Sequence, residues 1–309
     1  MLTKDKKSNI EEQITAYCQH NILNQDLKHP LYPTRLGAYE LFKSHGLPTS
    51  RNEHWKYTNI VSKLERIPTQ SQLKPAPTNL DNFINNFEIV KKAKENCDSI
   101  LVFMDGTLQD KLSVVNSLAK DISVTSLKRD PIPEWAVKIN SEKHSQNIDE
   151  LFNLNTVLME DGAIIDVGNN HGNAETIYII HVGNNDGFYN YRHIINVRDG
   201  AQINIFEFKI SNKADIEALY TSSIIWKIGD KCVVNNVKYQ AHNQITIGFN
   251  QQYADIQNDT EFNSFTISSG SKLLREFRDI NCNGSNSNIS ISGINLLDGD
   301  SHIDTMLSV

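Results

Sequence analysis

Cysteine, histidine and carboxylate side chains are the residues of this chain that could ligate a metal ion. The four cysteines lie far apart and form no Cys-x-x-Cys pair, so neither a zinc module nor a disulfide framework is predicted; they are Cys18, Cys97, Cys232 and Cys282. Cys232 alternates with apolar neighbours and is predicted to be a small core residue. Cys282 lies beside an Asn-Gly turn and is the weak thiol candidate for a metal ligand.

The segment DGDSHID, residues 298–304, is the other candidate for metal chemistry. Three aspartates and His302 stand at alternate positions, so on one strand face they could hold a metal ion. The segment is not a calcium loop, because Gly299 occupies its second position and no Glu follows. An Asp-Gly turn followed by a solvated strand is the alternative that the pattern favours.

The remaining histidines of the carboxyl-terminal half show no ligand-like spacing: His171, His181, His193 and His242. His181 ends the apolar strand TIYIIHV and is predicted to be a hydrogen-bonded core residue. The chain has no GxSxG elbow, no GxxxxGK[ST] phosphate loop and no GxGxxG fingerprint. No catalytic or nucleotide-binding residue is therefore predicted, and any ATP must be bound by a partner.

The composition excludes two classes of partner. Thirty basic against 37 acidic residues give a net charge of −7, which argues against a general phosphate-binding surface for nucleic acid. The charged amino terminus MLTKDKKSNIEEQ is no secretory signal, and no apolar run approaches the roughly 20 residues of a membrane span. With its unpaired thiols, the chain is predicted to be cytoplasmic.

The amino-terminal region has the period of helices. Ser8 and Glu11 match a capping box, and an apolar stripe follows at helical spacing, formed by Ile10, Ile14, Tyr17 and Cys18. A second helix, ended by Gly46, is predicted to bury one face, formed by Ala38, Leu41, Phe42 and His45.

Composition shifts divide the rest of the chain. Three prolines mark 66–82 as a surface connection. A short mixed segment follows, with a buried strand over 99–103, an Asp-Gly turn and a strand in ISVTSL. We therefore predict a helical domain with its linker over 1–82, a small α/β segment over 83–150 and a mainly β domain over 151–309.

The last region repeats an apolar strand, a turn containing Gly and another apolar strand. The turn glycines are separated by 38, 29, 41 and 29 residues and are Gly162, Gly200, Gly229, Gly270 and Gly299. This spacing is too irregular for a propeller but fits a β-solenoid whose outward loops vary in length. A β-sandwich is the alternative. Inside a solenoid we expect apolar ladders, with Asn at the corners bonded to neighbouring rungs.

Four segments together resemble the SufB/SufD family of scaffold subunits in SUF iron–sulfur cluster assembly, and its SufD branch in particular. They are GLP with R-x-E-x-W-K-Y-T (46–58), SILVFMDGTLQDKLSVVNSLAKDISVTSL (99–127), N-L-N-x-x-L-x-x-D-G (153–162) and SGSKLLREFRDINCNGSNSNISISGINLLDGDSHIDTMLSV (269–309). The resemblance implies a right-handed parallel β-helix behind a helical domain. It also implies a non-catalytic role beside a SufB-like subunit and a SufC-like ATPase. Any iron or iron–sulfur cluster would be held transiently at a partner interface.

The segment SRNEHWKYTNI, residues 50–60, could be a nucleic-acid platform or a structural clasp. If it is extended, Trp55 and Tyr57 point to one face and can pin the segment onto a core, while Arg51 and Glu53 stay solvated. A base-stacking platform would need surrounding positive charge. The sequence favours the clasp.

The resemblance also sets expectations for the carboxyl-terminal end. Proteins of the family continue with further coils and a helical domain that docks the SufC-like ATPase, and with a Cys-x-His region that faces SufB. The chain stops at Val309 without a matching Cys-x-His, so we expect a truncated β-helix and transfer no cluster ligand. Docking of a SufC-like ATPase is doubtful on this basis. The open end, residues 291–309, is expected to pair with a SufB-like subunit or with a second copy.

Two other functions stay open. Parallel β-helices often carry polysaccharide lyases or hydrolases, which need carboxylates clustered on one outer face. Asp161, Asp199 and Asp230 each neighbour a turn glycine instead. The chain could also be a bare protein-interaction module that keeps the fold without a cluster role.

Overall fold

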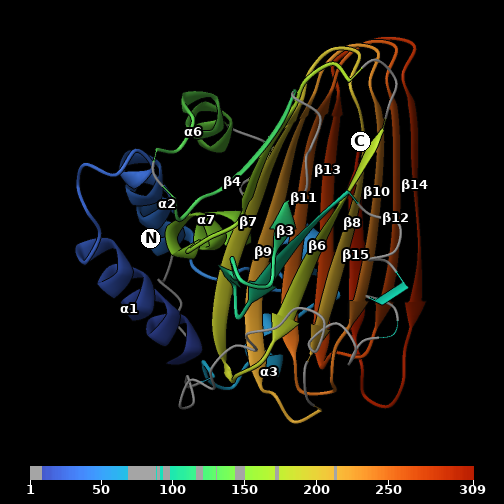
Figure 1. The fold of residues 1–309 in the computed structure, drawn as a ribbon. Coiled ribbons are helices and arrows are strands. Elements are labelled where there is room, and N and C mark those ends of the chain that lie inside the picture. The colour runs from blue at the N-terminus through green and yellow to red at the C-terminus, as the bar shows by residue number, and fades with distance from the viewer. Residues whose placement is uncertain are drawn as a thin grey trace.

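The computed structural model describes residues 9–68, 88, 91–92, 98–115, 121–129, 131–142, 150–170, 174–211 and 214–309. Two long sheets face each other to form a flattened coil, and helices cover the outer face of one of them (Figure 1). None of the helices in these ranges has the length and apolar character needed to cross a membrane.

The helical elements are α1 (Asn9–Leu23), α2 (Tyr32–His45), the 3-10 helix η1 (Glu53–Trp55), α3 (Ile60–Lys63), α6 (Glu134–Ser141) and α7 (Glu150–Leu158). The first strands are β1 (Ser99–Met104), β2 (Thr107–Leu108), β3 (Val114–Val115), β4 (Ile122–Ser126) and β5 (Ala163–Val167). The coil continues with β6 (Glu175–Gly183), β7 (Gly187–Val197), β8 (Gln202–Ser211), β9 (Ala218–Ile228) and β10 (Val233–Ala241). It closes with β11 (Ile247–Ile256), β12 (Glu261–Ser269), β13 (Leu273–Cys282), β14 (Asn288–Leu296) and β15 (Ile303–Ser308).

From β5 onward, successive strands alternate between the two sheets, and each pairs in parallel with the strand two places later. One sheet has the order β14-β12-β10-β8-β6-β1-β2 and the other β15-β13-β11-β9-β7-β5-β4. Gly187 pairs with Ala218, 31 residues later, and Ile247 pairs with Leu273, 26 residues later. The predicted β-solenoid is therefore confirmed, and the β-sandwich is excluded.

The turn glycines lie at two different edges of the coil, which explains their uneven spacing. Gly200 and Gly229 follow β7 and β9, at the edge where the chain crosses to the eight-stranded sheet. Gly270 and Gly299 follow β12 and β14, at the opposite edge. The coils still differ in length, 31 residues in one case and 26 in another, in agreement with the expected variation of the loops.

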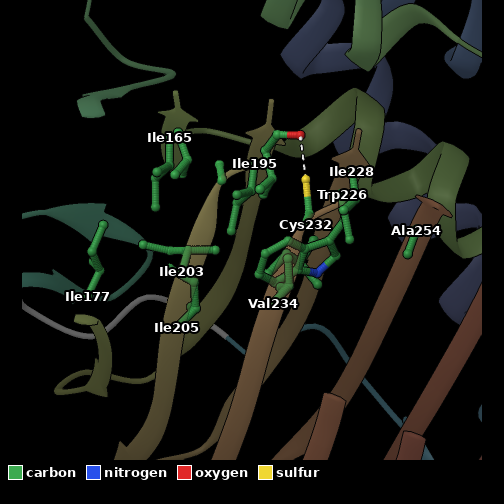
Figure 2. Close-up of a cluster of buried hydrophobic side chains, with 14 of the residues drawn as sticks. Ile165, Ile177, Ile195, Ile203, Ile205, Trp226, Ile228, Cys232, Val234 and Ala254 are labelled. Atoms are coloured by element: carbon green, nitrogen blue, oxygen red, sulfur yellow. Dashed lines mark hydrogen bonds between the residues drawn. The ribbon is translucent and has the colours of Figure 1, made fainter. Parts of the chain in front are cut away.

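The half of the coil interior nearest Gly200 is apolar. Isoleucine and valine from both sheets stack in ladders around Trp226, which is fully buried (Figure 2). Each buried aliphatic side chain contributes roughly 1.5–3 kcal/mol. The predicted apolar ladders are thus present, although they fill only part of the interior.

Polar side chains at the corner connect successive rungs, as predicted. The Asp230 amide donates to Asp199 Oδ1, the Asn258 amide to Asp230 Oδ1 and the Ser285 amide to Asn258 Oδ1, each at 2.9 Å. Each link satisfies a turn N–H that the sheets leave free. The corner aspartates therefore work as structural caps.

The amino-terminal helices pack on the outer face of the seven-stranded sheet. The predicted stripe of the first helix is confirmed, since Ile10, Ile14 and Cys18 are buried; Ser8, the predicted cap, lies outside the described residues. In α2 the buried face is Ala38, Tyr39 and Phe42. The predicted burial of Leu41 and His45 was wrong: both side chains are exposed, because the buried face of α2 is centred on Tyr39 and Phe42 instead.

The mixed segment is part of the coil. β1 is buried along its whole length and pairs in parallel with β6, and its predicted turn at Asp105 and Gly106 has positive φ at both residues. β4 pairs antiparallel with β5 at the far end of the other sheet. Most of the predicted 66–82 connection lies outside the described residues.

Candidate functional site in the coil interior

Charged residues occupy the other half of the coil interior. The five charged residues and one glutamine among them stand at inward positions of β8, β10 and β13 and are at most 4% exposed; they are Glu207, Lys209, Lys238, Gln240, Glu276 and Arg278. Parallel pairing puts Lys238 of β10 beside Glu207 of β8, and Gln240 beside Lys209. We call these six residues the interior charge cluster.

Opposite charges alternate through the cluster. Lys209 Nζ lies 3.1 Å from Glu207 Oε1, and Lys238 Nζ lies 3.3 Å from Glu276 Oε2. Burial alone would raise the pKa of Glu207, but the two lysines and nearby histidines outweigh it and hold that pKa far below the ordinary range. Both glutamates are therefore carboxylates at neutral pH.

Amides and hydroxyls complete the cluster and join the two sheets. Lys209 Nζ donates to Ser222 Oγ at 2.7 Å and to Asn250 Oδ1 at 2.5 Å. Gln240 Nε2 donates to Glu276 Oε1 at 2.8 Å. Because buried ion pairs seldom outperform apolar packing in stability, we interpret the cluster as a device that specifies the register of the stacked coils.

A histidine pair lies beside the cluster and forms the one potential metal site among the described residues. His181, His193 and Glu207 bring ligand atoms within 4.8 Å of one another. Burial lowers the pKa of His193 to about 4, so its ring is neutral at pH 7. The Ala163 amide donates to His193 Nδ1 at 2.9 Å, which assigns the ring proton to Nε2.

This tautomer leaves no lone pair for a metal on His193. Its Nε2 lies 2.9 Å from His181 Nε2, so it donates there and His181 carries its own proton on Nδ1. The third group, Glu207, is already paired with the ammonium of Lys209. The trio therefore does not fit a metal ion, and the prediction of His181 as a hydrogen-bonded core residue is confirmed.

A small cavity of about 40 Å³ lies next to the histidines, at the Gly270 side of the coil. It is large enough for roughly three water molecules. Aromatic side chains and Lys209 form much of its wall, and the lining includes Asp105, His181, Tyr189, Tyr191, Lys209, Tyr220, His242 and Thr246. This wall supplies hydrogen bonds but no thiol nucleophile.

The described thiols do not converge. Cys232 is buried, with Sγ 3.2 Å from the Arg198 carbonyl oxygen, so its predicted core role is confirmed (Figure 2). Burial raises the pKa of Cys18 to about 12, which keeps that thiol protonated. Cys282, the weak ligand candidate, is exposed, but it joins no metal-ligating group of the described chain. Cys97 lies outside the described residues.

The DGDSHID segment forms a turn and a strand, as its favoured interpretation predicted. Gly299 has positive φ, and β15 follows. His302 Nε2 lies 3.4 Å from Thr58 Oγ1, and Asp304 accepts from Thr58 and pairs with Arg275. A metal site here is not supported, since no metal-ligating group within the described ranges includes these residues.

The clasp is present, but its local structure differs from the prediction. Residues 53–55 form η1 and are not extended. Trp55 is buried against Phe249 and Arg275, whereas Tyr57 is 78% exposed. A tight turn rotates Tyr57 away from the face that Trp55 occupies, so the predicted aromatic pair is one anchor and one solvated ring.

The N-L-N-x-x-L-x-x-D-G motif has a structural role. Asn155 Nδ2 donates to the carbonyl oxygens of Tyr191 and Thr221, at 3.2 and 3.1 Å, and its Oδ1 accepts from Arg192 Nε at 3.0 Å. A Cβ on Gly162 would lie 1.7 Å from the Arg192 carbonyl oxygen. The motif thus docks α7 onto the coil.

Comparison with known protein families identifies the family of this chain. Residues 8–179 match the SufBD protein N-terminal region, and residues 179–309 match the domain described as SUF system FeS cluster assembly, SufBD core. The chain belongs to the SufB/SufD family. This family takes part in iron–sulfur cluster assembly, so the chain is a member of that system. A comparison with curated proteins finds no significant match.

Sequence reasoning missed the interior charge cluster of this SufB/SufD chain. A signal was present, because E-F-K, K-Y-Q and E-F-R place polar residues at alternate positions of β8, β10 and β13. Alternation usually means a solvated face. In a coil both faces of a strand can be buried, and here the charged positions are the inward ones.

Proposed function

We propose that this chain is a non-catalytic scaffold subunit, of the SufD kind, that acts with a SufB-like subunit in iron–sulfur cluster assembly in the cytoplasm. The observation that carries the proposal is the pair of consecutive family regions over residues 8–309. The resemblance of segment 46–58 to SufD proteins supports the choice within the family.

A cluster bound in this assembly is cargo, and we propose that its ligands meet at a partner interface. Cys18 and Cys232 are buried, and burial raises the pKa of both thiols. Both nitrogen atoms of His193 and the Nε2 of His181 are already engaged in hydrogen bonds. Exposed Cys282 is the described thiol that a partner could reach.

The proposed partner surface is the free edge of the last coil. β14 and β15 end their sheets, and the sequence of β14, NISISGINL, carries no charge. Exposed strands usually carry charges that prevent pairing with another chain. We propose that a strand from a SufB-like subunit, or from a second copy, adds here. A SufC-like ATPase would then join through the SufB-like subunit.

The alternatives receive less support. A carbohydrate-active site would need free clustered carboxylates, whereas Asp161 accepts from the Leu108 amide at 2.8 Å and Asp199 from the Asp230 amide at 2.9 Å. A bare interaction module would keep the fold but bind neither Suf partner, so binding measurements distinguish it.

The test is capture of purified SufB-like and SufC-like proteins, singly and together, on the tagged full chain. We expect the SufB-like subunit to be retained alone and the SufC-like ATPase only with it. Ser292→Lys on exposed β14 should weaken retention at least tenfold. Asn24→Lys, at the exposed position that directly follows α1, makes the same change in charge and should have no effect. Loss of both partners from the unmodified chain would reject the scaffold role.

A further inference from the structure

Two parts of the chain that are distant in sequence meet on the outer face of the seven-stranded sheet. Arg275 of β13 donates through Nη2 to the carbonyl oxygen of His54, 221 residues away, at 2.5 Å. Its guanidinium carbon lies 3.9 Å from the centre of the Trp55 ring. The amino-terminal segment therefore contacts the second-last strand of its sheet through one arginine.

The same arginine reaches the last strand. Arg275 Nη1 pairs with Asp304 Oδ2 of β15, and Thr58 Oγ1 donates to the same carboxylate oxygen. His302, just before β15, lies within hydrogen-bond distance of Thr58. The guanidinium stacks on an aromatic ring while its two terminal nitrogens bond a carboxylate and a carbonyl oxygen, a combination that the ammonium of lysine cannot reproduce.

The contacts are sheltered from water. The side chain of Arg275 is 2% exposed and that of Asp304 is 18% exposed. Removing one partner from a buried pair leaves the other charge uncompensated, so these contacts should matter far more than a surface salt bridge.

β15 is the edge strand of its sheet. It has six residues, pairs with β13 on one side, and is exposed or half-buried throughout. A strand anchored along one edge would fray unless its outward side were fixed as well.

We infer that the segment Asn52–Thr58 is a lock that fixes β15 in register through Arg275 and Asp304. The lock makes the amino-terminal region and the last coil one cooperative unit. If a partner strand adds to this edge, as the proposed function has it, the lock also sets the geometry of the edge that the strand meets. This second part of the inference rests on the proposed function.

The test is hydrogen–deuterium exchange on the full chain. Arg275→Met keeps much of the volume but loses the fork and the charge. We expect amide exchange over residues 303–308 to rise at least tenfold, with residues 203–210 of β8 unchanged. Asp304→Asn should show the same local effect. Arg275→Lys should restore only a minor part of the protection, since an ammonium cannot stack and fork together.

Lys227→Met is the matched control. Lys227 also lies on the outer face of this sheet and pairs with acidic residues, Glu142 and Asp255, but it does not contact the clasp. Unchanged exchange over 303–308 in Arg275→Met, or an equal rise over 203–210, would overturn the lock. Exchange needs no partner, so failure of the scaffold proposal would show separately, as absent binding by the unmodified chain.

Discussion

At the scale of single residues, the coil interior is the main departure from what the sequence predicts. The role of Cys232 followed from its apolar neighbours, and His181 was correctly placed in the core. The inward orientation of Glu207 and Lys209 could not be predicted. An alternating pattern of polar and apolar residues does not say which face of a strand is buried. Trp55 was correctly predicted as an anchor, whereas Tyr57 was misplaced because a single 3-10 turn changes the period.

Buried histidine makes stability depend on pH. Burial lowers the pKa of His193 to about 4, so the folded chain keeps this ring neutral while the unfolded chain takes up a proton below about pH 6.5. Stability is therefore complete above that value and is lost as the pH falls from 6.5 to 4, by about 1.4 kcal/mol per pH unit.

Urea unfolding across this range measures the effect. In His193→Gln the slope of the unfolding free energy against pH should decrease by the equivalent of about one proton. This holds whatever the change in stability at pH 7. The matched substitution His20→Gln, at an exposed position of α1, should keep the original slope. A variant His193→Gln with an unaltered slope would show that the ring is not held neutral by the fold.

At the scale of elements, strands and turns were largely predictable because apolar runs and Gly turns mark them directly. The length of one coil was not predictable from the glycines. They lie at both edges of the coil, so some of their spacings correspond to whole coils and others include an additional half coil. The docking of α7 also depends on contacts between distant strands, such as Asn155 with Thr221, which no local pattern encodes.

Gly162 tests how closely the segment between α7 and β5 approaches β7. A methyl group there would lie 1.7 Å from the Arg192 carbonyl oxygen, and φ is +153°. We expect Gly162→Ala to destabilise the chain by about 3 kcal/mol or more, measured by chemical unfolding. Gly37→Ala is the control: nothing lies within 4 Å of its added carbon, and in α2 it should stabilise by about 0.5–1 kcal/mol. A neutral Gly162→Ala would contradict the close packing.

At the scale of the whole molecule, the fold and the family were both accessible from the sequence, because four motifs occur in the order of the SufB/SufD family and the strand texture independently favours a coil. The partner arrangement is a property of surfaces, not of local pattern. Two thiols are buried, the histidine pair is hydrogen-bonded, and the edge strand β14 is uncharged. Together these features favour a subunit that supports cluster assembly through contact with another chain.

The most direct measurement is the iron and acid-labile sulfide content of the tagged chain, purified without oxygen from its own cells, together with the native mass of each species. We expect iron and sulfide to accompany only species that also contain a SufB-like subunit, and the chain alone to carry neither. Equimolar iron and sulfide on the isolated chain would contradict a scaffold role that depends on a partner.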